Sequence, residues 1–149
     1  MSREYLFKGK TYPKEEGVAF NNVWIEGDLV ISRDKYYIHP KANAFEVNNE
    51  LSKLIIMHEV IPKTVGEYVD LKDKNGNKVF EGDIVKFHTE TYTSMWDTIG
   101  VIKYFNASYG IAYKNDQHFL AFNEMSMYVR EYEVIGNIHD NKELLGELI

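Results

Sequence analysis

The side chains best suited to acid–base or metal chemistry in this chain are five histidines. No two of them have the spacing of a known zinc motif, and the sequence contains no cysteine that could supply a thiolate ligand. We therefore expect no metal site and no other cofactor. The histidines are His39, His58, His88, His118 and His139.

Two carboxylates, Glu81 and Asp83, are the nearest approach to a catalytic pair. Residues two apart on a strand point to the same face, so the pair has a possible geometry for acid–base work. Gly82 between them favours a turn instead, where acidic side chains bind backbone N–H groups or face water. No serine stands in a G-x-S-x-G motif, and no glycine-rich phosphate loop occurs. We expect a protein that is not an enzyme and assign no catalytic residue.

The segment best suited to binding is the hydroxyl-rich stretch from Thr89 to Thr98, which we expect to be a loop between strands. It carries Tyr92, Met95 and Trp96, and exposed side chains of these types are common anchors of protein interfaces. The alternative is that Trp96 folds back and covers one end of the C-terminal half. The interface would take an unknown protein partner or a second copy of the chain, giving a homo-oligomer.

The charge of the chain bears on other partners. Its formal net charge is −6, and no Lys/Arg cluster of the kind that follows a phosphate backbone is present. Nucleic-acid binding is therefore disfavoured, although a basic face assembled by folding stays open. The longest apolar run, residues 54–57, is far too short to cross a bilayer, and no secretory signal is expected. The lack of cysteine fits a reducing cytoplasm.

Short apolar runs separated by turn residues indicate a β-rich fold. In the first part we expect strand–turn–strand over 18–25, a break at 26–28, and strands over 29–31 and 36–38. Residues 48–60 fit either a helix or a strand, and we favour a strand from residue 54. Later strands are expected at 68–71, 79–80, 84–87, 100–105, 110–113, 117–122 and 132–138. The glycine or asparagine at four positions fits tight turns or a bulge: Asn75, Gly76, Gly82 and Gly136.

One short pattern occurs twice. Residues 23–30 read VWIEGDLV and residues 78–85 read KVFEGDIV, so both contain Glu-Gly-Asp between apolar residues. A duplicated β module and independent use of the same turn chemistry explain this equally well, because one match of eight positions is not a repeat architecture.

Three blocks resemble the YopX family of small proteins from phages and prophages. They are residues 60–68 (VIPKTVGEY), 71–85 (LKDKNGNKVFEGDIV) and 133–145 (EVIGNIHDNKELL), and residues 23–29 and 37–40 also look like the first half of that family. The resemblance departs at Tyr68-Val-Asp-Leu, and residues 89–98 match no block. It implies a β-rich fold with a C-terminal half similar to SH3-type barrels, a phage or prophage origin, and no particular reaction.

These observations predict an all-β protein with short helices at most. An N-terminal antiparallel meander over residues 1–62 would pack on an SH3-like small barrel over residues 63–149, with a shared core. The function expected is that of a phage accessory protein in the cytoplasm of a bacterial host, acting as a non-enzymatic interaction or self-assembling module. A nucleic-acid-binding small barrel is the alternative.

Overall fold

The computed structural model of the chain describes residues 3–40, 57–90, 95–113, 116–123 and 129–146, and for 89–90, 95–97 and 129–130 it describes the backbone only. The chain divides into two compact units, Met1–Tyr68 and Val69–Ile149. The sequence placed this division at residue 62, six residues earlier. Each unit is described by itself below.

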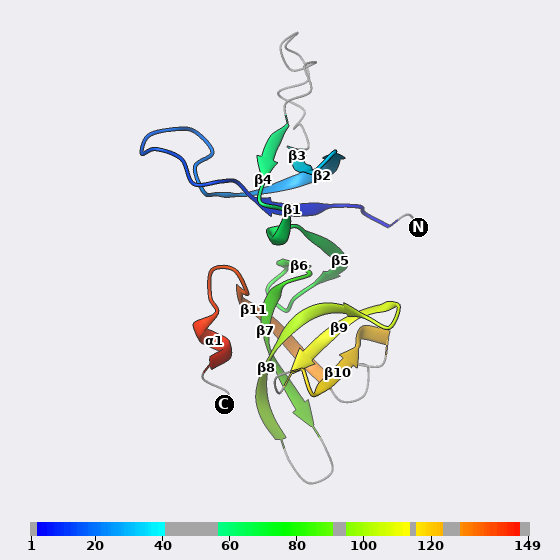
Figure 1. The fold of residues 1–149 in the computed structure, drawn as a ribbon. Coiled ribbons are helices and arrows are strands. Elements are labelled where there is room, and N and C mark those ends of the chain that lie inside the picture. Colours follow the sequence, from blue (N-terminus) through cyan, green and yellow to red (C-terminus); the bar gives the residue numbers. More distant parts are fainter. Residues whose placement is uncertain (1–2, 41–56, 91–94, 114–115, 124–128, 147–149) are drawn as a thin grey trace. The chain divides into compact units, whose positions relative to one another are not determined.

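The first unit is built on an antiparallel meander. Its strands β1, β2, β3 and β4 lie side by side in chain order, so each pairs with the next (Figure 1). A two-residue turn joins β2 to β3, since Ser32 lies opposite Lys35. The bounds are β1 Phe7–Lys10, β2 Trp24–Ser32, β3 Lys35–Pro40 and β4 His58–Val60.

The core of this unit is small and apolar. Ile25, Ile38 and Val60 are buried together, one from each of β2, β3 and β4. Gly9 faces them, and a Cβ at that position would lie 2.8 Å from a methyl carbon of Val60. The meander can therefore close over Val60 only because β1 has no side chain at Gly9.

The connection between β1 and β2 differs from the sequence prediction. Residues 18–20, expected as strand, are not part of one: Val18 has no regular structure and residues 19 and 20 form a turn, with Phe20 at a φ of 55°. The buried hydroxyl of Thr11 fastens the base of the loop by accepting from the Val23 N–H at 3.0 Å. Asn21 holds the loop itself, because its Oδ1 accepts from the Lys14 N–H at 2.6 Å. Local side-chain hydrogen bonds thus take the place of the strand pairing that the β-branched Val18 led us to predict.

Strand β5 (Gly66–Lys72) crosses the division and pairs with β1, with Phe7 opposite Glu67. The turn after β5 leads into β6 (Lys78–Phe80), so the first sheet has the order β4-β3-β2-β1-β5-β6. A short 3-10 helix, η3 (Pro62–Thr64), precedes β5.

The second unit carries a five-stranded antiparallel sheet in the order β10-β9-β8-β7-β11. Its strands are β7 Asp83–Glu90, β8 Met95–Phe105, β9 Ser108–Tyr113, β10 His118–Ala121 and β11 Val129–Asn137, followed by the short helix α1 Glu143–Gly146. The all-β class is confirmed. The described strands pair in an open order, with β10 and β11 at the two edges, and barrel closure is not among these pairs.

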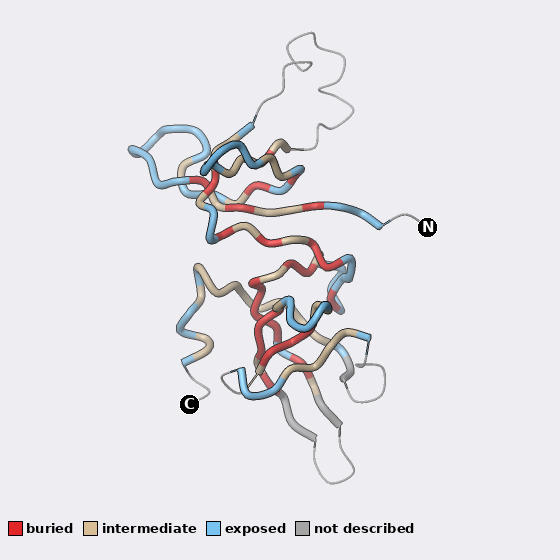
Figure 2. The backbone as a smooth tube through the Cα atoms, turned by 45° about the vertical axis from the view of Figure 1, so that its right-hand side comes forward, coloured by how far each residue is buried: buried red, intermediate tan, exposed pale blue. Residues whose placement is uncertain are grey.

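The main apolar cluster of the second unit lies on one face of this sheet. Ile84, Val101 and Ala112, which alternate with members of this cluster along β7, β8 and β9, are buried on the other face. Buried side chains come from β5, β6, β7, β8 and β9, and the strands around them are half-buried (Figure 2). The core residues are Val69, Val79, Val85, Phe87, Ile102 and Ile111. Val79, Ile84 and Val85 are fully buried.

Two further sequence predictions of local structure are wrong. Glu26-Gly27-Asp28, expected as a break, lies inside β2, where Gly27 is opposite Pro40. The stretch from Thr89 to Thr98, expected as a loop, is largely strand, because β7 continues to Glu90 and β8 begins at Met95. In both places pairing with a neighbouring strand overrides the local preference of the residues.

Candidate interaction surface

The sequence proposed Tyr92, Met95 and Trp96 as an interface loop. Tyr92 lies outside the described residues. Met95 and Trp96 lie in the first part of β8, opposite Glu90 and Thr89 of β7. Their side chains are not described, so their role in binding stays a prediction.

The turn residues Asn75 and Gly76 belong to a network centred on Asp73. One carboxylate oxygen of Asp73 accepts from the N–H groups of Asn75 and Asn77, each at 2.9 Å. The other accepts from the Val134 N–H of β11, also at 2.9 Å. Burial alone would raise the pKa of Asp73, but these backbone hydrogen bonds from Val134, Asn77 and Asn75 hold it below its usual value. Gly76 has a φ of 83°, a conformation that glycine adopts without strain. Residues 71–85, the second of the three blocks that resemble the YopX family, therefore join the β5–β6 turn to β11.

Gly82 and Gly136 also have structural explanations. Gly82 turns the chain between β6 and β7 with a φ of 93°, and the next residue, buried Asp83, accepts from the Phe80 N–H at 2.8 Å. Gly136 lies at a register shift in β11, and a Cβ there would be 2.5 Å from Oδ1 of Asn141. The Asn141 amide oxygen accepts from the Asn137 N–H at 3.1 Å, so this side chain anchors β11.

The clearest candidate surface is a group of aromatic side chains at the end of the β8–β9 hairpin. Tyr104 and Phe105 are 58% and 60% exposed, among the most exposed large apolar side chains described. Each is paired with a second ring: Tyr104 with Tyr109 at 5.0 Å between centroids, and Phe105 with Phe119 at 5.2 Å. We call these four residues the hairpin patch. Both pairs have edge-to-face geometry, which aromatic rings prefer.

The alternation of the strand explains why the patch appears on both faces. Tyr104 shares the core face of β8 with Ile102, whereas Phe105 lies on the opposite face. The hairpin extends past the core here, so both rings reach solvent. Phe119 reaches Phe105 from β10 across β9, because Gly110 of β9 has no side chain: a Cβ there would lie 2.7 Å from the Phe119 ring.

A tight turn holds the patch in place. Phe105 is opposite Ser108, so the turn contains only Asn106 and Ala107, with φ values of 52° and 63°. Two central residues with positive φ are the mark of the type I′ turn that suits the twist of paired strands. Asn is common in this conformation, but Ala is strained in it. The turn beside the patch is therefore only two residues long, and its backbone conformation is well defined.

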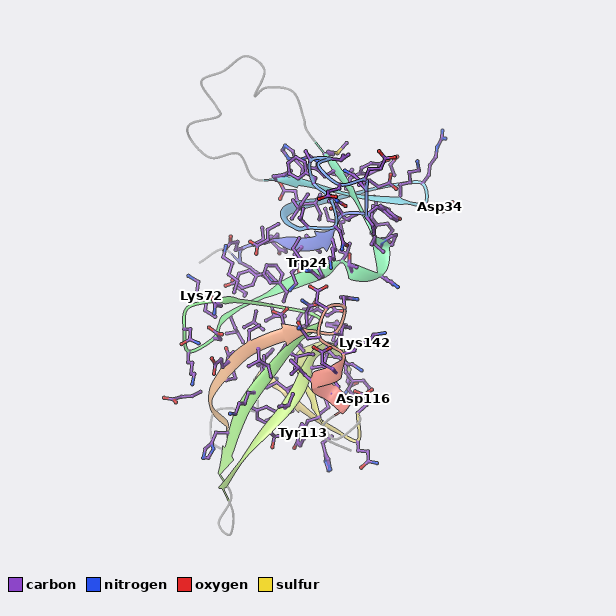
Figure 3. The ribbon with its side chains drawn as sticks, turned by 90° about the vertical axis from the view of Figure 1, so that its left-hand side faces the viewer. Trp24, Asp34, Lys72, Tyr113, Asp116 and Lys142 are labelled. Carbon is purple, nitrogen blue, oxygen red and sulfur yellow. The ribbon has the colours of Figure 1, made fainter. Side chains whose placement is uncertain are left out.

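Charge near the patch is balanced. Lys103 of β8 binds Asp116 of the β9–β10 connection through both carboxylate oxygens, at 2.8 and 2.9 Å (Figure 3 labels Asp116). At the two ends of this connection, the rings of Tyr113 of β9 and His118 of β10 stack at 5.2 Å between centroids. The charges of Lys103 and Asp116 beside the patch therefore cancel, and the surface around these two residues is neither strongly positive nor strongly negative.

A second, more polar feature lies on the outer face of β7 and β11. It is a hollow of about 230 Å³ bordered by both signs of charge. Glu133 is 3.5 Å from the Lys74 ammonium and accepts from Asn75 at 3.3 Å. The charged and polar groups that line the hollow are Lys74, Lys86, His88, Glu131 and Glu133. Because these charges largely compensate each other, the hollow has no evident preference for an anion or a cation.

A basic and aromatic cluster lies on β1 and β2 of the first unit. The ammonium groups of Lys8 and Lys10 lie 4.9 and 6.0 Å from the Trp24 ring centroid. They belong to β1, and Trp24 is opposite Lys10 on β2. Figure 3 labels Trp24 at this strand pair. Cation–π contacts of this kind hold the three side chains together.

The five histidines are spread over the fold. His39, His58, His88, His118 and His139 all lie in the described parts of the chain, and no group of three metal-binding side chains forms there. His58 stacks on Phe20 at 3.9 Å, and burial, aided by the charge of Lys14, lowers the pKa of its imidazole. Among the helices that the structure describes, none has the length and apolar character of a membrane span.

Sequence reasoning missed both the hairpin patch and the first strand. A signal for the patch was present: aromatic residues on both sides of Asn106 mark a tight hairpin, and two consecutive aromatics must point to opposite faces. Strand β1 had a weaker signal, since its residues Phe7-Lys-Gly-Lys contain only one apolar side chain.

Comparison with known proteins supports the sequence resemblance. The model of the YopX protein family matches residues 18–146. No curated protein matches the chain. The crystal structure of protein EF1440 from Enterococcus faecalis is similar in fold, with a TM-score of 0.55 and 18% sequence identity over 97% of this chain and 99% of that one. At that identity the likeness concerns the fold alone. Because the family model covers nearly the whole chain, the protein belongs to the YopX family.

Proposed function

We propose that the protein is a non-enzymatic accessory protein of a phage or prophage, which acts in the bacterial cytoplasm by binding another protein surface. The family resemblance supports the phage or prophage origin. The observation that carries the binding role is the hairpin patch, where Tyr104 and Phe105 are more than half exposed on a two-residue turn.

Exposed aromatic pairs of this kind are costly to leave in water and effective in an interface. Large rigid rings bury much apolar area while losing little conformational freedom, and they dominate the energetics of many interfaces. Here the two pairs are already packed in edge-to-face geometry before any partner binds. The ordering cost on binding is therefore small, which favours affinity.

The experiment compares a patch variant with a matched control in affinity capture from the host bacterium. The patch variant is the double change Tyr104→Ser and Phe105→Ser, and the control is Tyr5→Ser, which removes a 63% exposed aromatic from the first unit. We expect the wild type and control to retain the same partner and the patch variant to lose it, with the purified partner binding at least about tenfold more weakly. Equal binding of that purified partner by the patch variant contradicts the proposal.

A second candidate function is binding of single-stranded nucleic acid, favoured by the Lys8–Trp24–Lys10 cluster. Stacking on aromatic rings beside lysines is how single strands are bound without sequence preference. The net charge of −6 weighs against it. The test is fluorescence anisotropy with labelled single-stranded DNA at low salt. Binding that weakens steeply as salt rises, and that Trp24→Ala abolishes, establishes this function; no binding at low salt removes it.

A further inference from the structure

The two edge strands of the sheet in the second unit, β11 and β10, differ in how far their outer backbone groups are covered. The β5–β6 turn covers the edge at β11: the Lys74 N–H donates to the Tyr132 carbonyl at 3.1 Å, and the Asp73 carboxylate accepts from the Val134 N–H at 2.9 Å. Strand β11 also has two register shifts, at 130/133 and 134/136. Coverage and bulges are two of the devices by which proteins prevent a sheet edge from pairing with another chain.

Within the described residues, the edge at β10 has neither a covering segment nor a bulge. Its four residues, His118-Phe-Leu-Ala, include no proline, lysine or carboxylate, and they pair with β9 in unbroken register. In the part of the chain that the structure describes, no backbone group pairs with the outer side of β10. Its N–H and C=O groups on that side are thus available to a further antiparallel strand.

We propose that this strand is β10 of a second copy of the chain, so that the two sheets join edge to edge about a two-fold axis. This inference rests on the proposed interaction function and names one partner for it. An interface of this type is isologous, because the same strand serves both copies. Main-chain pairing of this kind recruits a strand, and not a nucleic acid or a small ligand.

Symmetry restricts the register. Residues directly opposite each other in an antiparallel pair point to the same face of the sheet. A two-fold axis between neighbouring strands must therefore be perpendicular to the sheet and must place one residue opposite its own copy. Phe119 is the residue that gains most, because its ring lies beside that of Phe105, on the face of the sheet opposite Leu120. Two such aromatic pairs then meet across the axis.

The charges near the edge do not oppose this pairing. His118 is the one titratable side chain of β10, and in the proposed register it lies opposite Leu120 of the other copy. The nearby Asp116 is already bound to Lys103. Like charges are therefore not brought opposite each other, a juxtaposition that would destabilise the pair.

The chain offers a direct test because it contains no cysteine. In the proposed register the two Cα atoms of residue 119 are about 5 Å apart, within the range that a disulfide spans. We expect Phe119→Cys to form a covalent dimer under mild oxidation. Phe105→Cys is the matched control: it lies in the same patch but on β8, two strands from the edge, and we expect it to remain monomeric under denaturing, non-reducing conditions.

Light scattering on the purified full chain supplies the second measurement. The wild type should have twice the chain mass of 17.4 kDa, and Phe119→Lys should have the mass of one chain, because two lysines would face each other at the axis. A monomeric wild type, or a dimer that Phe119→Cys fails to cross-link, overturns this inference. The Tyr104→Ser, Phe105→Ser variant separates the two proposals: a dimer that persists while the captured partner is lost shows that the edge and the patch act independently.

Discussion

The tripeptide Glu-Gly-Asp occurs twice in this chain and takes two different structures. In the first copy Glu26, Gly27 and Asp28 lie within the nine-residue strand β2. In the second copy Gly82 turns the chain between β6 and β7 with a φ of 93°, and Asp83 begins β7. The two copies therefore do not share one strand–turn–strand unit, which removes the local structural support for a duplicated module.

The comparison shows that the same residue types meet different physical needs. At Gly27 the backbone of β3 leaves no room, since a Cβ would collide with the carbonyl oxygen of His39. At Gly82 there is room, with no atom nearer than 3.8 Å to an added Cβ, but the backbone conformation disfavours other residues. The aspartates differ too, because Asp83 is buried and accepts a hydrogen bond whereas Asp28 is exposed.

The largest effect is expected from Gly27→Ala. The collision involves backbone atoms of His39 and Pro40, which cannot turn away as a side chain can. We expect a loss of at least about 3 kcal/mol in the free energy of unfolding of the first unit. Urea unfolding followed by Trp24 fluorescence in a Trp96→Phe background measures it. Gly17→Ala is the control, because its φ of 86° is strained but nothing lies within 4 Å of its Cβ; an equal cost at both sites contradicts the steric explanation.

The second prediction compares the two aspartates. Asp83→Ala leaves the Phe80 N–H without its acceptor in a buried position, so we expect a cost of about 2 kcal/mol in the stability of the second unit. Asp28→Ala removes an exposed side chain and should change stability by less than about 0.5 kcal/mol. Urea unfolding followed by circular dichroism measures both. If the two variants lose the same stability, the hydrogen bond between Asp83 and the Phe80 N–H does not stabilise the second unit in the way that its buried position indicates.

The third prediction concerns strain without collision. Gly82→Ala should cost about 1–2 kcal/mol, because an L residue at a φ of 93° is disfavoured while the space around it is open. Gly82→Asn should cost less, since asparagine tolerates positive φ better than alanine does. Thermal unfolding of the two variants orders them. Equal losses, or a larger loss for asparagine, would mean that packing against Ile138 matters more than backbone strain.

Much of the fold was predictable because the turns of the second unit have strong local signals. Asn75-Gly76 and Gly82 produced the turns we expected, and the strands between them follow from alternating apolar residues. The first Glu-Gly-Asp could not be placed from sequence, because what makes Gly27 necessary is the approach of β3, a contact outside its own segment. Strand pairing decided that position, and local chemistry did not.

The candidate surface was harder to predict for a related reason. Tyr104 and Phe105 are exposed because the β8–β9 hairpin extends past the last core residue of β8, Ile102. The sequence alone does not indicate where the core ends along this hairpin. Trp96 attracted attention because tryptophan is a common anchor, yet its strand position depends on how far β7 and β8 stay paired. Residue type therefore suggested an aromatic surface but did not locate it.

The smallest expected effects come from acid, and they distinguish the units. Burial lowers the pKa of His58 below its usual 6.5, so the unfolded first unit takes up a proton that the folded unit resists. Its stability should fall as the pH drops below about 6.5 and stop falling at the folded pKa. Backbone hydrogen bonds lower the pKa of Asp73, so the contribution of this carboxylate to the stability of the second unit should be lost as the pH falls below the ordinary value of 3.8.

Unfolding of each unit between pH 8 and pH 3, followed by NMR, measures this separation. His58→Gln should flatten the first unit's response near neutrality and leave the second unit unchanged, whereas Asp73→Asn should flatten only the acid response of the second unit. Asp28→Asn, a change at an exposed position of the first unit, serves as the control. A first unit that still loses stability near neutrality in His58→Gln would contradict the role given to the burial of this imidazole.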